Sequence, residues 1–337
     1  MILTAISVIL VFGILVFVHE LGHFLFAKLG GIAVTEFAIG MGPAIFKKEY
    51  KDTLYSVRIL PFGGFTSMED DNTKEGSFFT KPFSTKVLVL VAGSVFNIIL
   101  GYVILVILTA MNGYVGTTTV IKFDDNAVSR SFLQEGDNIL KLNNHRVRTS
   151  NDITYELLRD PDGLIEFELM REGKKLEIPV QFQMQEIAEG VNAIKMDFFV
   201  LAKEPTPLDY VTYPINWSLS IIKQVWGSLI DLFTGRVPVN QLSGPVGIVG
   251  AIGKASKMGL DSLLLMTAFI AINLGVFNLL PLPILDGGKI LIFLIELIRK
   301  KPTSEKTLDL INNVSMGFIL LLVIYATGND IFRLIKK

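Results

Sequence analysis

The chain opens with an apolar run, from about Ile2 to Ala27, that contains the sequence His19-Glu20-Leu21-Gly22-His23. Ionisable side chains at membrane depth cost roughly 2.5 kcal/mol or more each on insertion scales, so they are usually there for a function. Histidines at positions i and i+4 lie on one face of a helix, about 5–6 Å apart, and can bind one metal ion together. The run therefore predicts a membrane helix that carries two metal ligands.

Three further apolar runs come close to the ~20 residues that a helix needs to cross a bilayer. They extend from about Val87 to Met111, from Leu263 to Leu285 and from Ile311 to Ile335. Only 19% of the 337 residues are charged, which is less than a soluble domain of this length carries. We expect a polytopic α-helical membrane protein with four transmembrane helices, the first of which is retained rather than cleaved as a signal peptide.

Basic residues set the expected orientation of these spans, because positive charges in short loops stay on the cytoplasmic side. They are concentrated between spans one and two and between spans three and four: Lys28, Lys47, Lys48, Lys51, Arg58, Lys74, Lys81 and Lys86, then Lys289, Arg299, Lys300, Lys301 and Lys306. We therefore expect a multi-pass protein of the cell (inner, cytoplasmic) membrane whose N-terminus and long middle segment lie outside the cytoplasm.

Four parts are predicted along the chain. Residues 1–111 hold the first two spans and a cytoplasmic β-hairpin loop at about 32–68, and residues 263–337 hold the last two spans. Residues 112–200 alternate in polarity over short runs and predict an extracytoplasmic β-rich domain. Residues 201–262 predict an extracytoplasmic interfacial amphipathic segment, because Leu208–Phe233 is rich in Trp and Tyr. The alternative for Leu208–Phe233 is a fifth span.

Asp286 is the best candidate for a third ligand. The chain has no cysteine, so any metal must use His, Asp or Glu. Asp286 follows two prolines and precedes two glycines, which prevent a continuous helix, and unwound backbone at membrane depth is tolerated only in protein or beside a cavity. With four spans, His19, His23 and Asp286 share the cytoplasmic end; a fifth span would separate them. The third histidine, His145, is expected to be a solvated loop residue.

These motifs carry a family resemblance. His19–His23, together with the later run Asn278–Gly288, resembles the site-2 proteases, the intramembrane zinc metalloproteases. Ile39–Pro43 and Pro61–Phe65 resemble the family's membrane re-entrant β-hairpin, and Gly93–Asn97 resembles its GxxxN pattern in span two. Leu242–Ile248 resembles a segment of the bacterial branch that has an extracytoplasmic PDZ domain, and Glu135–Asn143 resembles the PDZ signature itself.

The resemblance implies a zinc-dependent intramembrane endopeptidase with one bound Zn²⁺. Its metal ligands would be His19, His23 and Asp286, and Glu20 would be the catalytic base. Substrate-binding residues are expected at Asn278, Asn97, Gly63 and Gly64. Its substrates would be single-pass membrane proteins or membrane peptides, such as anti-sigma factors, signal-peptide remnants or pheromone precursors. The lipid bilayer is its other expected partner, and no nucleic acid is expected.

Several alternatives stay open at this point. The chain could be a zinc transporter or metal-sensing membrane protein, or an inactive homologue that acts as a scaffold. The PDZ-like domain could bind peptides or exclude substrates with bulky outside domains. A helical substrate must unwind before cleavage, and we expect an edge strand near Thr53–Leu60 to accept it by strand addition.

Overall fold

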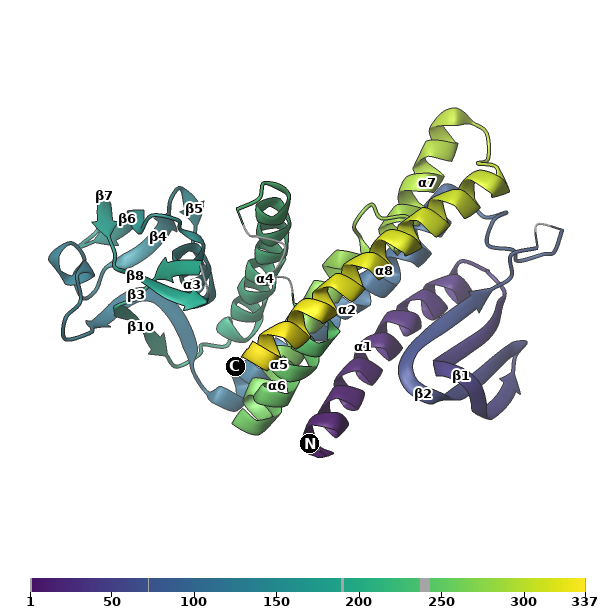
Figure 1. Ribbon diagram of the computed structural model, residues 1–337, viewed down its shortest axis with the longest axis horizontal. Helices are drawn as coiled ribbons and strands as arrows, with labels where there is room; N and C mark the ends of the chain where they lie inside the picture. The colour runs from purple at the N-terminus through teal and green to yellow at the C-terminus, as the bar shows by residue number, and fades with distance from the viewer. Residues whose placement is uncertain (1, 72, 189–190, 237–242, 337) are drawn as a thin grey trace. The chain divides into compact units, whose positions relative to one another are not determined.

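Figure 1 shows the computed structural model, which describes residues 2–71, 73–188, 191–236 and 243–336. Among these residues, four helices are long and apolar enough to cross a membrane, as predicted: α1 (Ile2–Leu29), α2 (Phe83–Asn112), α6 (Leu260–Asn278) and α8 (Glu305–Lys336). The chain divides into two compact units, one formed by Met1–Ile104 with Val225–Lys337 and the other by Leu105–Gln224.

Three further helices accompany the spans: α4 (Asp209–Phe233), α5 (Pro245–Met258) and α7 (Asp286–Arg299). Helix α4 covers the segment for which a fifth span was the alternative, and it is not among the four spanning candidates. Helix α5 lies within the predicted segment 201–262. In the structure it packs on α1 and α6 through a buried cluster formed by Val8, Val11, Leu15, Ile252 and Ala271.

The third span is shorter than the predicted Leu263–Leu285. Helix α6 ends at Asn278, and helix α7 begins at Asp286 after an irregular loop. Prolines in this loop cannot donate the backbone hydrogen bonds that a continued helix needs. Gly287 and Gly288 then let the first turn of α7 lie directly on the loop, because a Cβ at either position would overlap the backbone of Leu279 or Leu282.

The predicted hairpin consists of β1 (Val34–Tyr50) and β2 (Thr53–Met68). Residues 36–39 pair with 54–57 on one side and with 64–67 on the other, and residues 54–57 also pair with 46–49. Segment 54–57 is therefore internal to the sheet, and the expectation of an open edge near Thr53–Leu60 is wrong there. The two edges are formed by residues 46–49 and 64–67.

The hairpin lies along α1 in the same unit (Figure 1). The ring of Phe37 packs edge-on against Phe17, with 6.2 Å between centroids, and lies 5.1 Å from that of Phe24. Gly64 allows the close approach of β2, since a Cβ there would lie 3.2 Å from the Val16 side chain and 2.8 Å from the Ala38 carbonyl oxygen. Edge segment 64–67 is thus brought to α1 together with its neighbour in the sheet, segment 36–39.

The second unit is β-rich, as predicted for residues 112–200, and its identity as a PDZ domain stays a prediction. Its main sheet has the order β10-β3-β4-β6-β7, with β5 paired to β4, and β8 pairs with β9. In chain order its elements are β3 (Val115–Phe123), the 3-10 helix η1 (Ser129–Ser131), β4 (Asn138–Leu142), β5 (His145–Arg146), α3 (Ser150–Arg159), β6 (Leu164–Arg171), β7 (Lys174–Gln181), β8 (Met184–Ala188), β9 (Val191–Ile194) and β10 (Phe198–Lys203).

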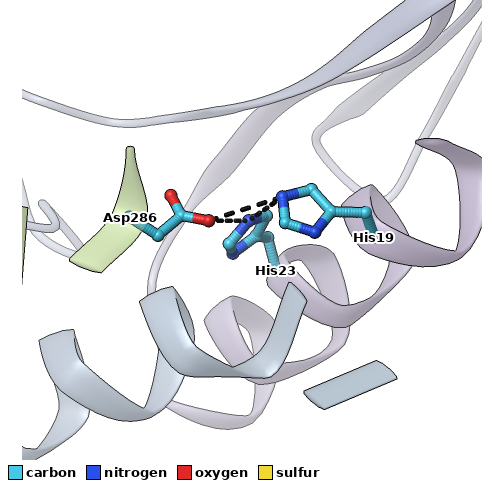
Figure 2. A group of neighbouring side chains, drawn as sticks. All are labelled: His19, His23 and Asp286. Atoms are coloured by element: carbon cyan, nitrogen blue, oxygen red, sulfur yellow. Dashed lines mark hydrogen bonds and ion pairs between the residues drawn. The ribbon is translucent and has the colours of Figure 1, made fainter. Parts of the chain in front are cut away.

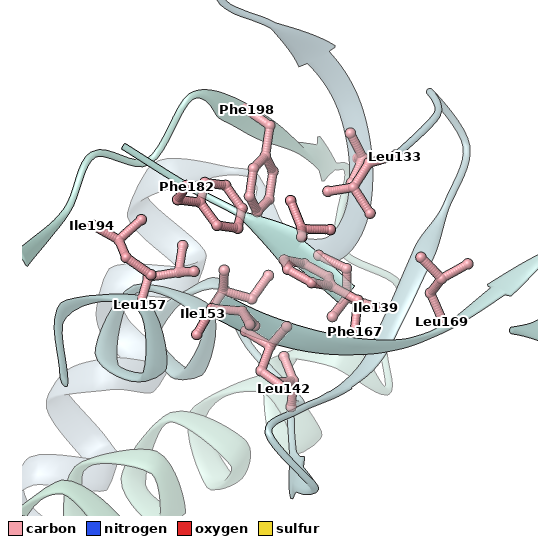
Figure 3. Packing of buried hydrophobic residues seen from close by; sticks show 14 of the residues in the cluster. Leu133, Ile139, Leu142, Ile153, Leu157, Phe167, Leu169, Phe182, Ile194 and Phe198 are labelled. Atoms are coloured by element: carbon pink, nitrogen blue, oxygen red, sulfur yellow. The ribbon is translucent and has the colours of Figure 1, made fainter. Parts of the chain in front are cut away.

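Local sequence explains this unit well. Thr149 and Asp152 form the capping box that starts α3, and positive φ angles at Glu172 and Gly173 make the tight turn between β6 and β7. Figure 3 shows the apolar core between the sheet and α3, in which the side chains of Phe167 and Ile153 have no exposed surface.

Two buried carboxylates in the second unit form ion pairs. The fully buried carboxylate of Asp137 accepts from Nε and Nη2 of Arg171, both at 2.7 Å, which raises the pKa of that guanidinium. His145 is half exposed, but it is not merely solvated as predicted. Its Nδ1 lies 2.9 Å from the buried carboxylate of Glu156, which also accepts from Lys223 at 2.6 Å. Asp137 of the PDZ-like signature and the third histidine, His145, therefore each form an ion pair within this unit.

Candidate metal centre

The structure brings together the three predicted metal ligands. His19 and His23 extend from the same face of α1, and Asp286 is the first residue of α7 (Figure 2). The Nε2 atoms of the two imidazoles are 3.2 Å apart. Asp286 Oδ2 lies 3.4 Å from Nε2 of His19 and 3.2 Å from Nε2 of His23. Among the described residues, this trio is the one group of His, Asp and Glu side chains placed to hold a metal ion.

The triangle of donor atoms has the size that zinc requires. Two ligands at Zn–N or Zn–O distances of about 2.0–2.1 Å in a tetrahedral site are about 3.3–3.4 Å apart. The observed separations of 3.2 to 3.4 Å agree with that value. Apart from its contacts with the imidazoles, the buried Oδ2 of Asp286 has no hydrogen-bond partner in the described part of the chain. An anionic oxygen in that position fits a cation between the three side chains.

Helix α2 fixes the orientation of His23. The Nδ1 atom of His23 is 2.8 Å from the carbonyl oxygen of Val89, so this nitrogen carries the proton and Nε2 keeps its lone pair. Gly93, one helical turn further along α2, leaves the space for both rings. A Cβ at Gly93 would lie 2.5 Å from His23 Nε2 and 2.8 Å from His19 Cε1.

Two amide side chains lie beside the imidazole of His19. Nδ2 of Asn97 on α2 lies 3.4 Å from His19 Nδ1, whereas Nδ2 of Asn278 at the end of α6 lies 3.5 Å from Nδ1 and 3.4 Å from Nε2 of the same ring. Asn97 is fully buried, and its Oδ1 has no hydrogen-bond partner among the residues that the structure describes. Both predicted asparagines are therefore close to a predicted ligand.

Glu20 and the two glycines of the hairpin complete the predicted site residues. Thr66 on β2 donates its hydroxyl proton to Oε2 of Glu20 at 2.9 Å. A Cβ at Gly64 would lie 3.3 Å from Cγ of Glu20, so Gly64 is in direct proximity to the predicted base. Gly63 is different: it has a φ of +78° and faces the side chain of Met41 within the hairpin. The structure thus brings Gly64, but not Gly63, next to a predicted catalytic residue.

Comparison with known proteins identifies the family. Residues 7–322 match the sequence model of Peptidase family M50. The chain belongs to this family. An M50 relative from Clostridium acetobutylicum, which carries the provisional name of a zinc metalloprotease, is 34% identical over 331 residues, covering 96% of each chain. RasP of Bacillus subtilis, named a regulator of sigma-W protease, is 30% identical over 419 residues, covering 98% of this chain and 99% of RasP.

The M50 relatives differ in length. The zinc metalloprotease RasP of Bacillus licheniformis is 29% identical over 418 residues, covering 98% of this chain and 99% of the relative. Both RasP alignments span more positions than the 337 residues of this chain, so each RasP protein contains residues that have no counterpart here. The clostridial relative matches over 331 residues without such an excess.

Membership of family M50 decides between the functional classes. The protein is a multi-pass membrane zinc metalloprotease, a hydrolase that acts on protein substrates, and zinc is its cofactor. The cluster of His19, His23 and Asp286 is consistent with the zinc site. A protease is therefore favoured over the zinc transporter or metal sensor.

Sequence reasoning missed three contacts of the site. The acceptor for His23 is the backbone carbonyl of Val89, and every residue has such a carbonyl, so no letter in the sequence could mark it. Gly93 was marked as the start of the GxxxN pattern, but its proximity to both imidazoles depends on the rotation of α2. The hydroxyl of Thr66 reaches Glu20 only through the hairpin's register.

Proposed function

We propose that this M50 protein is an intramembrane endopeptidase that cleaves the transmembrane segments of single-pass membrane proteins. The observation that carries the proposal is the position of His19 and His23 on α1, a candidate membrane span, within 3.4 Å of Asp286 at the α6–α7 break. Anti-sigma factors, signal-peptide remnants and pheromone precursors are the proposed substrate classes. The name of Bacillus subtilis RasP, which refers to sigma-W, supports the first class.

His19, His23 and Asp286 would hold the metal through the two Nε2 atoms and Oδ2. When bound there, zinc polarises the scissile carbonyl and lowers the pKa of a water molecule toward ~7. Glu20, the neighbour of His19, takes a proton from the attacking water and passes it to the leaving amine. Because Glu20 points to Thr66 on the hairpin, it is free to act as a base rather than as a ligand.

Asn97 holds His19 in the tautomer that binds metal through Nε2. When Nε2 of His19 faces the metal, Nδ1 carries a proton and needs an acceptor. A rotation of the Asn97 amide by 180° brings its unpaired Oδ1 to that proton at the place where Nδ2 lies 3.4 Å away. Asn278 contacts the same ring from the end of α6, where it also borders the unwound loop. We assign Asn278 to substrate contact as well as to His19.

An unwound substrate strand would add to edge segment 64–67. A helical substrate hides its carbonyl groups in hydrogen bonds, so the cleaved segment must be extended, and an exposed sheet edge accepts an extended peptide through its backbone. Segment 64–67 pairs with 36–39 on one side only, among the described residues, and it carries the contacts to Glu20. Segment 46–49, the other edge, has no such contact.

The site would lie toward the cytoplasmic side. This orientation rests on the basic residues of the two short loops, as predicted, and on the position of His19 in the C-terminal half of α1. Because the chain has no cysteine, single cysteines introduced into either loop can report which side of the membrane they face. Labelling of these cysteines only by a reagent that enters the cytoplasm is the expected result.

Substitution Glu20→Gln tests the proposal. The amide keeps the shape of the side chain but cannot take a proton, so we expect full zinc content and a loss of cleavage of at least about 100-fold. Glu75→Gln, at an exposed position in the loop after the hairpin, is the matched control and should cleave normally. The readouts are zinc content of the purified protein and cleavage of a single-pass reporter. Undiminished cleavage by Glu20→Gln would refute the proposed mechanism.

A further inference from the structure

The side chain of Thr66 connects the hairpin to the proposed catalytic base. Its Oγ1 is 2.9 Å from Oε2 of Glu20 and 3.1 Å from the backbone carbonyl oxygen of the same residue. A hydroxyl has one proton to donate, and the carboxylate is the shorter and the charged acceptor. Hydrogen bonds to ionised acceptors are about twice as strong as neutral ones, so the hydroxyl of Thr66 donates its hydrogen bond to the Glu20 carboxylate.

The backbone around Thr66 is held firmly enough to orient its partner. Thr66 pairs with Phe37 across the sheet, and the ring of Phe37 packs against Phe17 on α1. Two residues before Thr66, Gly64 brings the strand to within contact of Val16 and Glu20. The hydroxyl is therefore fixed relative to α1 by two contacts, one through Phe37 and one through Gly64.

Glu20 needs such an anchor. A glutamate has three rotatable side-chain bonds, and it loses entropy when it is held in one conformation. Among the described residues, Thr66 provides the one side-chain hydrogen bond to the Glu20 carboxylate. With Oε2 held by Thr66, the other oxygen, Oε1, is left to accept the proton of the attacking water.

We propose that Thr66 is a positioning residue for the catalytic base, so that strand β2 sets the rotamer of Glu20 as well as presenting an edge to the substrate. This inference rests on the proposed role of Glu20. It makes the hairpin a part of the proton-transfer machinery: a strand that is displaced from α1 releases the carboxylate from its working orientation.

Substitutions of Thr66 test this role. Thr66→Val keeps the shape of the side chain and removes the hydroxyl, so we expect kcat for cleavage of a single-pass reporter to fall by about 10- to 100-fold, the usual cost of losing an orienting partner. We expect KM to change by less than about twofold and the zinc content to be unchanged, because no ligand is touched. Thr66→Ser keeps the hydroxyl and should restore kcat to within about threefold of the unsubstituted protein.

Thr53→Val is the matched control. Thr53 is on the same strand, is fully buried, and donates its hydroxyl to the carbonyl oxygen of Val34, away from Glu20. If loss of a hairpin hydroxyl acts only through stability, Thr53→Val should lower kcat as much as Thr66→Val does. We expect it to leave kcat unchanged. A second control introduces Thr66→Val into the Glu20→Asp variant. The shorter aspartate side chain does not reach the hydroxyl of Thr66, so the double variant should have a kcat within about twofold of that of Glu20→Asp alone.

Three outcomes would overturn the inference: unchanged kcat in Thr66→Val, equal damage in Thr66→Ser and Thr66→Val, or a rise in KM without a fall in kcat. Each would leave the proposed endopeptidase intact provided that Glu20→Gln abolishes cleavage. Cleavage by Glu20→Gln would instead remove the proposed role of Glu20, and the role of Thr66 with it.

Discussion

Substitution Gly93→Ala should weaken zinc binding although it replaces none of the proposed ligands. The new Cβ would lie 2.5 Å from Nε2 of His23 and 2.8 Å from Cε1 of His19. Non-bonded atoms of this kind normally stay about 3.5 Å or more apart, so the His23 ring must move by about 1 Å. Zinc sites tolerate ligand displacements of only about 0.2 Å.

The expected loss of zinc affinity follows from that displacement. Removal of an outer partner of a ligand costs about 10- to 100-fold in metal affinity, and a 1 Å shift of the ligand atom itself should cost at least the upper figure. A 100-fold loss corresponds to about 2.7 kcal/mol. We expect cleavage of a single-pass reporter to fall in parallel and to recover partly when zinc is added in excess.

Gly101→Ala provides the comparison for this experiment. It lies on the same face of α2, and its Cβ would lie 2.5 Å from Cγ1 of Ile272 and 2.9 Å from the carbonyl oxygen of Ala268, away from the imidazoles. It should therefore disturb helix packing but not zinc binding. Zinc affinity is measured by competition with a chelator of known strength. If Gly93→Ala binds zinc within about threefold of the unsubstituted protein, the assignment of the site is wrong.

Two predictions concern the second unit. Arg171→Met leaves the buried carboxylate of Asp137 without its ion-pair partner and should destabilise the unit by about 3–5 kcal/mol, measured by hydrogen exchange of the sheet. Lys175→Met, which removes an exposed ion pair, should cost less than about 1 kcal/mol. Equal protection in both variants would contradict this. The hydrogen bond from Lys203 lowers the pKa of Asp209 to about 2, below the unfolded value of about 3.9, so its contribution is present above pH 4 and is lost as the pH falls through 2. A carboxyl-carbon titration with a midpoint near 4 would exclude this link.

The spans and the cluster of His19, His23 and Asp286 could be predicted because their signals are local. Hydropathy over about 20 residues fixes a membrane helix, and the i, i+4 spacing places His19 and His23 on one face whatever lies around them. Asp286 was predictable because prolines and glycines in an apolar run require a protein environment for the unwound backbone. The four-span topology then placed all three residues at one depth.

The remaining features depend on tertiary register, which the sequence does not encode locally. The alternation of residues 53–60 indicated a strand, but the double pairing of segment 54–57 follows from the way in which two long strands bend back on each other. Helix α5 has small and apolar residues that suit either an interface or a helix bundle, and only its packing on α1 and α6 distinguishes the two. The hydrogen bond from Thr66 to Glu20 joins residues 46 positions apart.

The placement of Asp286 has a consequence for the biosynthesis of the enzyme. Zinc held by His19 and His23 alone would be bound more weakly than zinc held by three ligands, and the proposed third ligand, Asp286, emerges from the ribosome only after more than four fifths of the polypeptide has been made. A nascent chain that stalls or is truncated before that point would therefore not hold the ion tightly. On the proposed assignment of the site, proteolytic competence arises only once Asp286, at the start of α7, is in place.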